Sequence, residues 1–276
     1  MSETSPATFF FQIAVLVAGV VLWIRSLTVS RHLLPWRGEN NLTRWDIPLT
    51  DFLLLLFFVL LFIFFGSQAA VYWTDGSGLN TPDSLLRQYV IPGYTFHLCS
   101  MVAWVLFGFY HPNIWPRRQL PWISSMIAAA KTLLFALPVI ALVGLVWVKM
   151  LEAVNMPTDL QDLVGIMQEA DNSFYLVALV LLAVVIAPIN EELLFRGGIF
   201  RFLNNRIPTA LAMIISSILF ALLHMNWFSF LPLIVLGCFL CLVTLKTGSL
   251  KPAMLMHALF NLNSILAILG APATGI

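Results

Sequence analysis

Two adjacent glutamates and an arginine interrupt a long apolar stretch of this sequence, in Pro188-Ile-Asn-Glu-Glu-Leu-Leu-Phe-Arg196. Glu192 and Arg196 are four residues apart, so on a helix they share one face and can form an ion pair. Glu191 is then turned about 100° away from that pair and has no partner nearby in the sequence. A carboxylate in this position can take a proton from water and return it. The alternative is that all three side chains form a hydrated helix end at the cytoplasmic surface.

Two histidines follow, each four residues from another residue of chemical interest. Phe220 comes four residues before His224, and a helix would put both on one face. His257 comes four residues before Asn261, and an imidazole and an amide on one face can aim two hydrogen-bond donors at a developing oxyanion. Both pairs also have a structural interpretation, as packing residues or as bonds between neighbouring helices. Together with Glu191 they would form a hydrolytic set that needs no nucleophilic side chain.

These motifs resemble those of the CPBP family of intramembrane proteases, which includes the Rce1-type CAAX prenyl endopeptidases and the Abi-type proteins. The family motifs E-E-x-x-x-R, F-x-x-x-H and H-x-x-x-N correspond to residues 191–196, 220–224 and 257–261. The resemblance covers about residues 173–269. It implies a peptidase whose site lies on successive membrane helices.

The resemblance also implies roles for the motif residues. Glu191 and His224 would activate a water molecule. His257 and Asn261 would stabilise the oxyanion. The other motif positions would support the site: Glu192, Arg196 and Phe220.

Relatives of this kind are often named metalloproteases, so zinc is the alternative to a site without metal. His224, His257 and Glu191 would provide three ligands and leave one position open, as in a catalytic zinc site. The sequence has no H-E-x-x-H, and Asn261 beside His257 suits oxyanion binding better than metal ligation. We therefore expect a site that uses no cofactor.

The composition indicates that the elements carrying these residues lie in a membrane. Of the 276 residues, 60% are hydrophobic and 10% are charged, against about 25% charged in a soluble domain. The mean hydropathy is +0.93. A net charge of +1 provides no basic surface for a nucleic acid. The expected partners are membrane lipid and a protein or peptide substrate in the bilayer, and ionisable groups at membrane depth are functional candidates.

Eight apolar blocks are long enough to cross a bilayer as helices. They lie at roughly 9–24, 51–73, 90–110, 122–148, 173–190, 208–224, 228–245 and 252–269. The pattern lacks the alternation of a membrane barrel, so it predicts an all-α polytopic bundle. We expect residues 1–172 to form four N-terminal spans and residues 173–270 to form the four spans of the protease core.

The basic residues predict that the N-terminus lies outside. In that orientation the cytoplasmic connections carry most of the positive charge, as the positive-inside rule requires. These residues are Arg25, Arg31, Arg37, Arg44, Arg117, Arg118, Arg196, Arg201, Arg206, Lys246 and Lys251. We expect a multi-pass protein with its active site toward the cytoplasmic side, in the cell membrane if the source is bacterial.

Straight helices over these blocks would keep the catalytic residues apart. Glu191 would lie at the cytoplasmic end of the fifth block, and His224 would end the sixth block about 24 Å farther across the membrane. Either residues 197–207 turn back into the membrane, or the fifth helix starts earlier and leaves Glu191 deeper. Because Gly197 and Gly198 permit a sharp turn, we expect a break in the helix there, where surrounding protein or a water cavity would tolerate it.

The leading hypothesis is a glutamate-dependent intramembrane endopeptidase that cleaves a membrane-associated substrate. A prenylated C-terminal tail is one substrate that the family resemblance implies. One alternative is a non-catalytic scaffold or bacteriocin-immunity protein that keeps the polar cluster for packing or partner binding. Another is a proton-coupled transporter that uses Glu191 and the histidines as a relay, although the sequence shows no inverted repeat.

Overall fold

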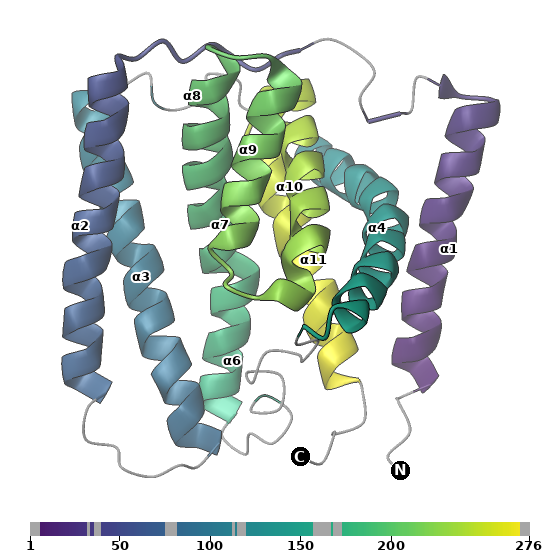
Figure 1. The fold of residues 1–276 in the computed structure, drawn as a ribbon, viewed down its shortest axis with the longest axis horizontal. Coiled ribbons are helices and arrows are strands. Elements are labelled where there is room, and N and C mark those ends of the chain that lie inside the picture. The colour runs from purple at the N-terminus through teal and green to yellow at the C-terminus, as the bar shows by residue number, and fades with distance from the viewer. Residues whose placement is uncertain are drawn as a thin grey trace.

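The computed structural model of the chain describes residues 6–31, 34–35, 40–74, 82–111, 114, 120–156, 167 and 173–270. These residues form helices and no strands, which confirms the predicted all-α class (Figure 1). Seven helices among them are long and apolar enough to span a membrane, and the eighth apolar helix, Thr209–Leu222, is shorter. The chain is therefore an integral multi-pass membrane protein.

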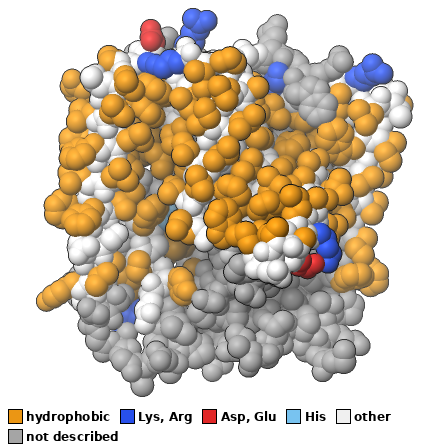
Figure 2. All heavy atoms as spheres, viewed as in Figure 1, with side chains coloured by type: hydrophobic (Ala, Val, Ile, Leu, Met, Phe, Trp, Pro, Cys, Tyr) orange, Lys and Arg blue, Asp and Glu red, His pale blue; other side chains and the backbone are white. Residues whose placement is uncertain are grey.

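Four long helices precede the segment that carries the motifs. They are α1 (Pro6–Thr28), α2 (Leu49–Thr74), α3 (Pro82–Tyr110) and α4 (Trp122–Ala153). Helix α2 packs along α3, and α1 packs against the strongly inclined α4 (Figure 1). Figure 2 shows hydrophobic side chains over most of the described surface of one face, which is the surface that lipid tails would contact.

The fifth membrane crossing is a helical column that runs from residue 173 to residue 204. It consists of α6 (Ser173–Leu181), η3 (Leu182–Ile186), α7 (Ala187–Glu192), η4 (Leu193–Phe200) and α8 (Arg201–Asn204), where η3 and η4 are π-helical. The column is thus longer than the predicted block 173–190, and it extends past the charged motif.

The predicted break at Gly197 and Gly198 is wrong, because both residues lie inside η4 and the column continues to Asn204. They are small for packing reasons instead. A Cβ atom on Gly197 would lie 3.1 Å from Leu250 Cδ1, and one on Gly198 would lie 3.1 Å from the Trp104 ring. The alternative of an earlier start does not hold either, because α6 begins at Ser173 as the block predicted. Glu191 lies deeper than the hydrophobic block suggested because the column continues past it to Asn204.

Three helices complete the bundle: α9 (Thr209–Leu222), α10 (Trp227–Thr247) and α11 (Lys251–Leu269). Proline and glycine punctuate them, with Pro208 preceding α9, Pro252 in the first turn of α11 and Gly248 ending α10 at φ 66°. Helix α4 packs against both α10 and α11. The proposed boundary between residues 172 and 173 stays a prediction.

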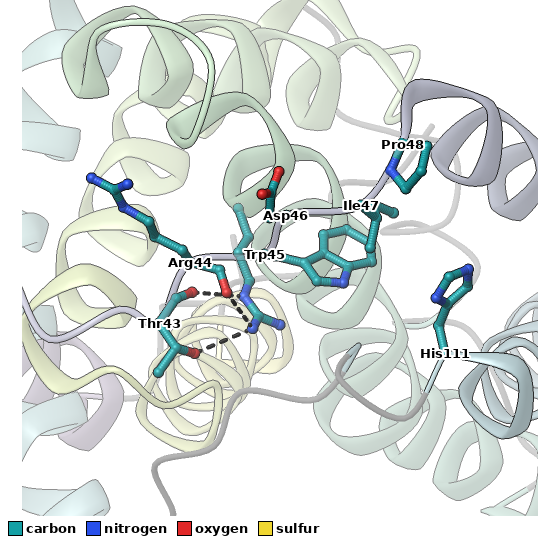
Figure 3. A pocket seen from close by; sticks show the side chains of 8 residues that line it. Thr43, Arg44, Trp45, Asp46, Ile47, Pro48 and His111 are labelled. Atoms are coloured by element: carbon teal, nitrogen blue, oxygen red, sulfur yellow. Dashed lines mark hydrogen bonds between the residues drawn. The ribbon is translucent and has the colours of Figure 1, made fainter.

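A buried arginine ties the connection before α2 to the end of the column. Arg201 donates from Nε to the Thr43 carbonyl at 3.0 Å and from Nη1 to the Ile114 carbonyl at 2.6 Å. Its guanidinium also lies 5.6 Å from the centre of the Trp45 ring. Figure 3 shows Thr43, Trp45 and His111 among the residues that line a cavity of about 430 Å³ at this end of the bundle. The cavity shares no lining residue with the three motifs, so it belongs to the packing of this end of the bundle.

Candidate active site

The lengths of two neighbouring helices bring Glu191 and His224 to the same depth. Glu191 lies 13 residues before Asn204, the last residue of α8, and His224 lies 15 residues after Thr209, the first residue of α9. At about 1.5 Å per residue these positions are roughly 20 Å from the shared connection at residues 205–208. Because α9 is short, its far end stops inside the membrane and not at the opposite surface.

Glu192 is the centre of a buried ionic cluster. Its Oε1 atom lies 2.9 Å from Arg196 Nη1 and 3.0 Å from His257 Nδ1. Arg196 also donates from Nη2 to the Gly237 carbonyl at 3.2 Å. The predicted pair between Glu192 and Arg196 is therefore present, and its side chains are fully buried. A buried carboxylate that is neutralised and held by two donors is suited to support a site.

Glu191 has a different environment from its neighbour. Its side chain is 18% exposed, and its Oε2 atom lies 3.7 Å from His257 Nε2. Glu191 thus has a partner, but one that comes from α11 and could not be found nearby in the sequence. Because Nδ1 of His257 faces Glu192, Nε2 is the nitrogen that faces Glu191 and the site.

Phe220 contacts both motif histidines through its ring. Its centroid lies 4.8 Å from the ring of His224 and 5.5 Å from the ring of His257. The imidazoles are therefore no farther apart than these two distances combined. The Nδ1 atom of His224 lies 2.9 Å from the carbonyl oxygen of Phe220. With Nδ1 donating to that carbonyl, Nε2 of His224 is left for the site.

The side chain of Asn261 is hydrogen-bonded to the helical column. Within the described residues it makes no hydrogen bond to Glu191 or Glu192. Its Nδ2 atom donates to the Ala183 carbonyl at 2.8 Å. In η3 the Ala187 N–H donates to Leu182, and Pro188 has no N–H to give, so the Ala183 carbonyl is open to a side-chain donor. The amide of Asn261 has a second N–H, which leaves one donor for a ligand.

Asn190 and His97 are two polar residues at the site that the motifs do not include. Asn190 Nδ2 lies 3.0 Å from His97 Nδ1, and both residues are buried. His97 lies on α3, which precedes the motif-bearing segment in the chain. The sequence motifs did not reveal the role of His97. Its occurrence at membrane depth among apolar residues was the available signal.

Within the described ranges no group of three His, Cys, Asp or Glu side chains is arranged to hold a metal. Nδ1 of His257 faces Glu192, and Nε2 of the same ring faces Glu191. A site without metal stays a prediction.

Known proteins are similar to this chain chiefly in the part that carries the three motifs. A family model described as "Type II CAAX prenyl endopeptidase Rce1-like" matches residues 173–263. The chain is 25% identical over 169 residues to the UPF0177 protein YxdF of Lactococcus lactis subsp. lactis, which is 60% of this chain and 86% of that protein. It is 31% identical over 101 residues to an uncharacterized protein of Mycoplasma capricolum subsp. capricolum, which is 35% of this chain and only 29% of that protein. No solved structure matches.

Proposed function

We propose that this chain, whose residues 173–263 belong to the Rce1-like family, is an intramembrane endopeptidase that hydrolyses a peptide bond of a membrane-associated substrate. The family supports a CAAX-protease type of peptidase. The observation that carries the proposal is the difference between the two glutamates. Glu192 is buried and paired, whereas Glu191 is partly exposed and faces a histidine nitrogen.

In the proposed reaction Glu191 removes a proton from water, and the resulting hydroxide attacks the substrate carbonyl carbon. The π-bond electrons move to the carbonyl oxygen, which becomes an oxyanion. The C–N bond then breaks, and the proton passes to the leaving amine. His224 would hold the water, since its Nε2 is not used by the Phe220 carbonyl.

His257 and Asn261 would stabilise the oxyanion as hydrogen-bond donors. Glu192 supports this role of His257, because it accepts from Nδ1 and so fixes the ring orientation. The donor to the oxyanion would be Nε2 of His257, the nitrogen that faces Glu191. The bond of Asn261 to Ala183 supports a fixed position for its amide.

The test uses purified protein in liposomes with two probes, a farnesylated C-a-a-X peptide and an unprenylated membrane-spanning peptide, and detects products by mass spectrometry. We expect the wild type to cleave at least one probe. We expect Glu191→Gln, His224→Ala and His257→Ala to lose at least about 100-fold in kcat/KM, a loss typical of an essential acid-base group. Glu152→Gln is the matched control, because Glu152 pairs with Lys149 on the exposed end of α4.

Cleavage by Glu191→Gln at the wild-type rate would contradict the general-base role. A folded wild type that cleaves neither probe would favour the scaffold or immunity alternative. We also propose that the reaction needs no metal, so activity should persist in excess EDTA. Loss of activity in EDTA that zinc restores would overturn this part of the proposal.

A further inference from the structure

The Asn190–His97 pair joins the motif-bearing column to a helix outside the matched family region. Asn190 directly precedes Glu191 on α7, and His97 lies in the second half of α3. The exposed fractions are 1% for Asn190 and 9% for His97. A polar pair at membrane depth is unfavourable unless its groups are bonded to each other, and such pairs are candidates for function.

The hydrogen bond assigns the protons of His97. The amide nitrogen of Asn190 is a donor only, so Nδ1 of His97 must accept its hydrogen bond. In a neutral imidazole the proton then resides on Nε2. His97 is thus a neutral ring that accepts from Asn190 on one side and has a donor on the other.

Helix α3 is docked closely enough to hold this pair in place. One turn before His97, Gly93 lies so near the column that a Cβ atom there would clash with Leu182 Cδ2. The neighbouring Tyr94 donates from its hydroxyl to the Ala178 carbonyl at 3.0 Å. These contacts fix α3 against α6 and η3, so the imidazole of His97 has a defined position beside Asn190.

We propose that His97 is a positioning residue of this site: by accepting from Asn190 it fixes the turn of α7 that presents Glu191 to the substrate. This inference rests on the proposed function, and it makes α3 a part of the catalytic machinery. The bond from Asn190 places His97 next to the residue that directly precedes Glu191.

The test compares three variants of α3 in the liposome cleavage assay. His97→Leu removes the acceptor, whereas His97→Asn keeps one, because the asparagine Oδ1 is attached at the same position as Nδ1. Ser100→Ala is the control, since Ser100 is equally buried on the same helix and its hydroxyl makes no hydrogen bond within the described structure. We expect His97→Leu to lower kcat by about 10- to 100-fold with KM within about twofold, as for other outer-shell hydrogen-bond partners. We expect His97→Asn to recover most of that loss.

A His97→Leu variant as active as Ser100→Ala would overturn the proposal, as would a His97→Asn variant as impaired as His97→Leu. If His97→Leu does not fold, the ¹⁵N spectrum of the wild-type imidazoles provides a second measurement. The signal that disappears in His97→Asn should show a proton on Nε2 and none on Nδ1, and a proton on Nδ1 would contradict the inference. Failure of the proposed function is distinct, because it appears as full activity of Glu191→Gln.

Discussion

Adjacent carboxylates at positions 191 and 192 have opposite surroundings, because successive side chains on a helix point about 100° apart. Glu192 is bound by Arg196 of η4 and His257 of α11 in a fully buried position. Glu191 keeps partial exposure and approaches His257. One residue therefore stabilises the arrangement, and the other is available for chemistry.

This difference predicts opposite stability effects for one chemical change. Glu192→Gln leaves the buried Arg196 charge without its carboxylate, so we expect a loss of about 3 kcal/mol in folding free energy, near the lower end for a broken buried pair. Glu191→Gln breaks no such pair and should change stability by less than about 1 kcal/mol. Thermal unfolding in detergent by intrinsic fluorescence measures both. Equal melting temperatures for the two variants would show that Glu192 has no such structural role.

The motif spacing predicted the ion pair of residues 192 and 196 but not the partners of the other polar side chains. Pairs four residues apart are local, so helix geometry alone is enough to predict them. The contact of Glu191 with His257 and the pair of Asn190 with His97 join residues far apart in the chain. Such contacts depend on how helices pack, which no local pattern specifies.

At the scale of the helix, hydrophobicity located the elements well but ended the fifth one too early. The predicted fifth block stopped at residue 190 because charged residues follow, and charged residues usually mark the end of a membrane helix. Here Glu192, Arg196 and Arg201 are buried by neighbouring helices and the column continues through them. Because the helices around these charged side chains bury them, the column needs no turn at Gly197 and Gly198.

The sequence pattern could not predict the π-helical segments, because the same apolar run is found in α-helices and in π-helices. Both have carbonyl groups that side chains of other helices use. Asn261 on α11 donates to Ala183 in η3, and Ser216 on α9 donates to Phe195 in η4 at 3.1 Å. The widened turns thus provide acceptors to two of the helices that carry the motifs, as is frequent for π-segments at functional sites.

The close approach of α9 and α10 predicts a specific effect of glycine substitution. A Cβ atom on Gly237 would lie 2.7 Å from Ser217 Cβ, whereas one on Gly144 would meet only Pro232 Cγ at 3.6 Å. Gly237→Ala should therefore destabilise the protein by about 1–3 kcal/mol through overpacking. Gly144→Ala is the control and should be neutral or slightly stabilising. Unfolding in detergent compares the two, and a Gly237→Ala variant as stable as Gly144→Ala would contradict the tight packing.

For the whole molecule, the candidate site extends beyond the matched family region. Residues 173–263 supply all the motif side chains, but α3 supplies His97 and α4 packs on α10 and α11. The N-terminal helices are thus in contact with the elements that carry the site. Composition and the length of the apolar blocks were enough to predict a polytopic bundle. The chain has more apolar residues than a water-soluble domain, and many of them therefore face lipid.

The orientation of the bundle is the property that the charge distribution predicts and that labelling can test. If basic connections lie in the cytoplasm, Asp46, exposed before α2, is inside, and Glu152, exposed at the far end of α4, is outside. We expect a membrane-impermeant maleimide to label Glu152→Cys in intact cells and to label Asp46→Cys only after permeabilisation, with wild-type labelling as the baseline. Glycosylation at Asn41 is a poorer reporter, because its amide donates to the Lys246 carbonyl at 2.7 Å and a glycan would break that bond. The reverse labelling pattern would place the N-terminus in the cytoplasm and the basic ends of α8 and α11 outside, against the direction in which the proposed peptidase would meet a cytoplasmic tail.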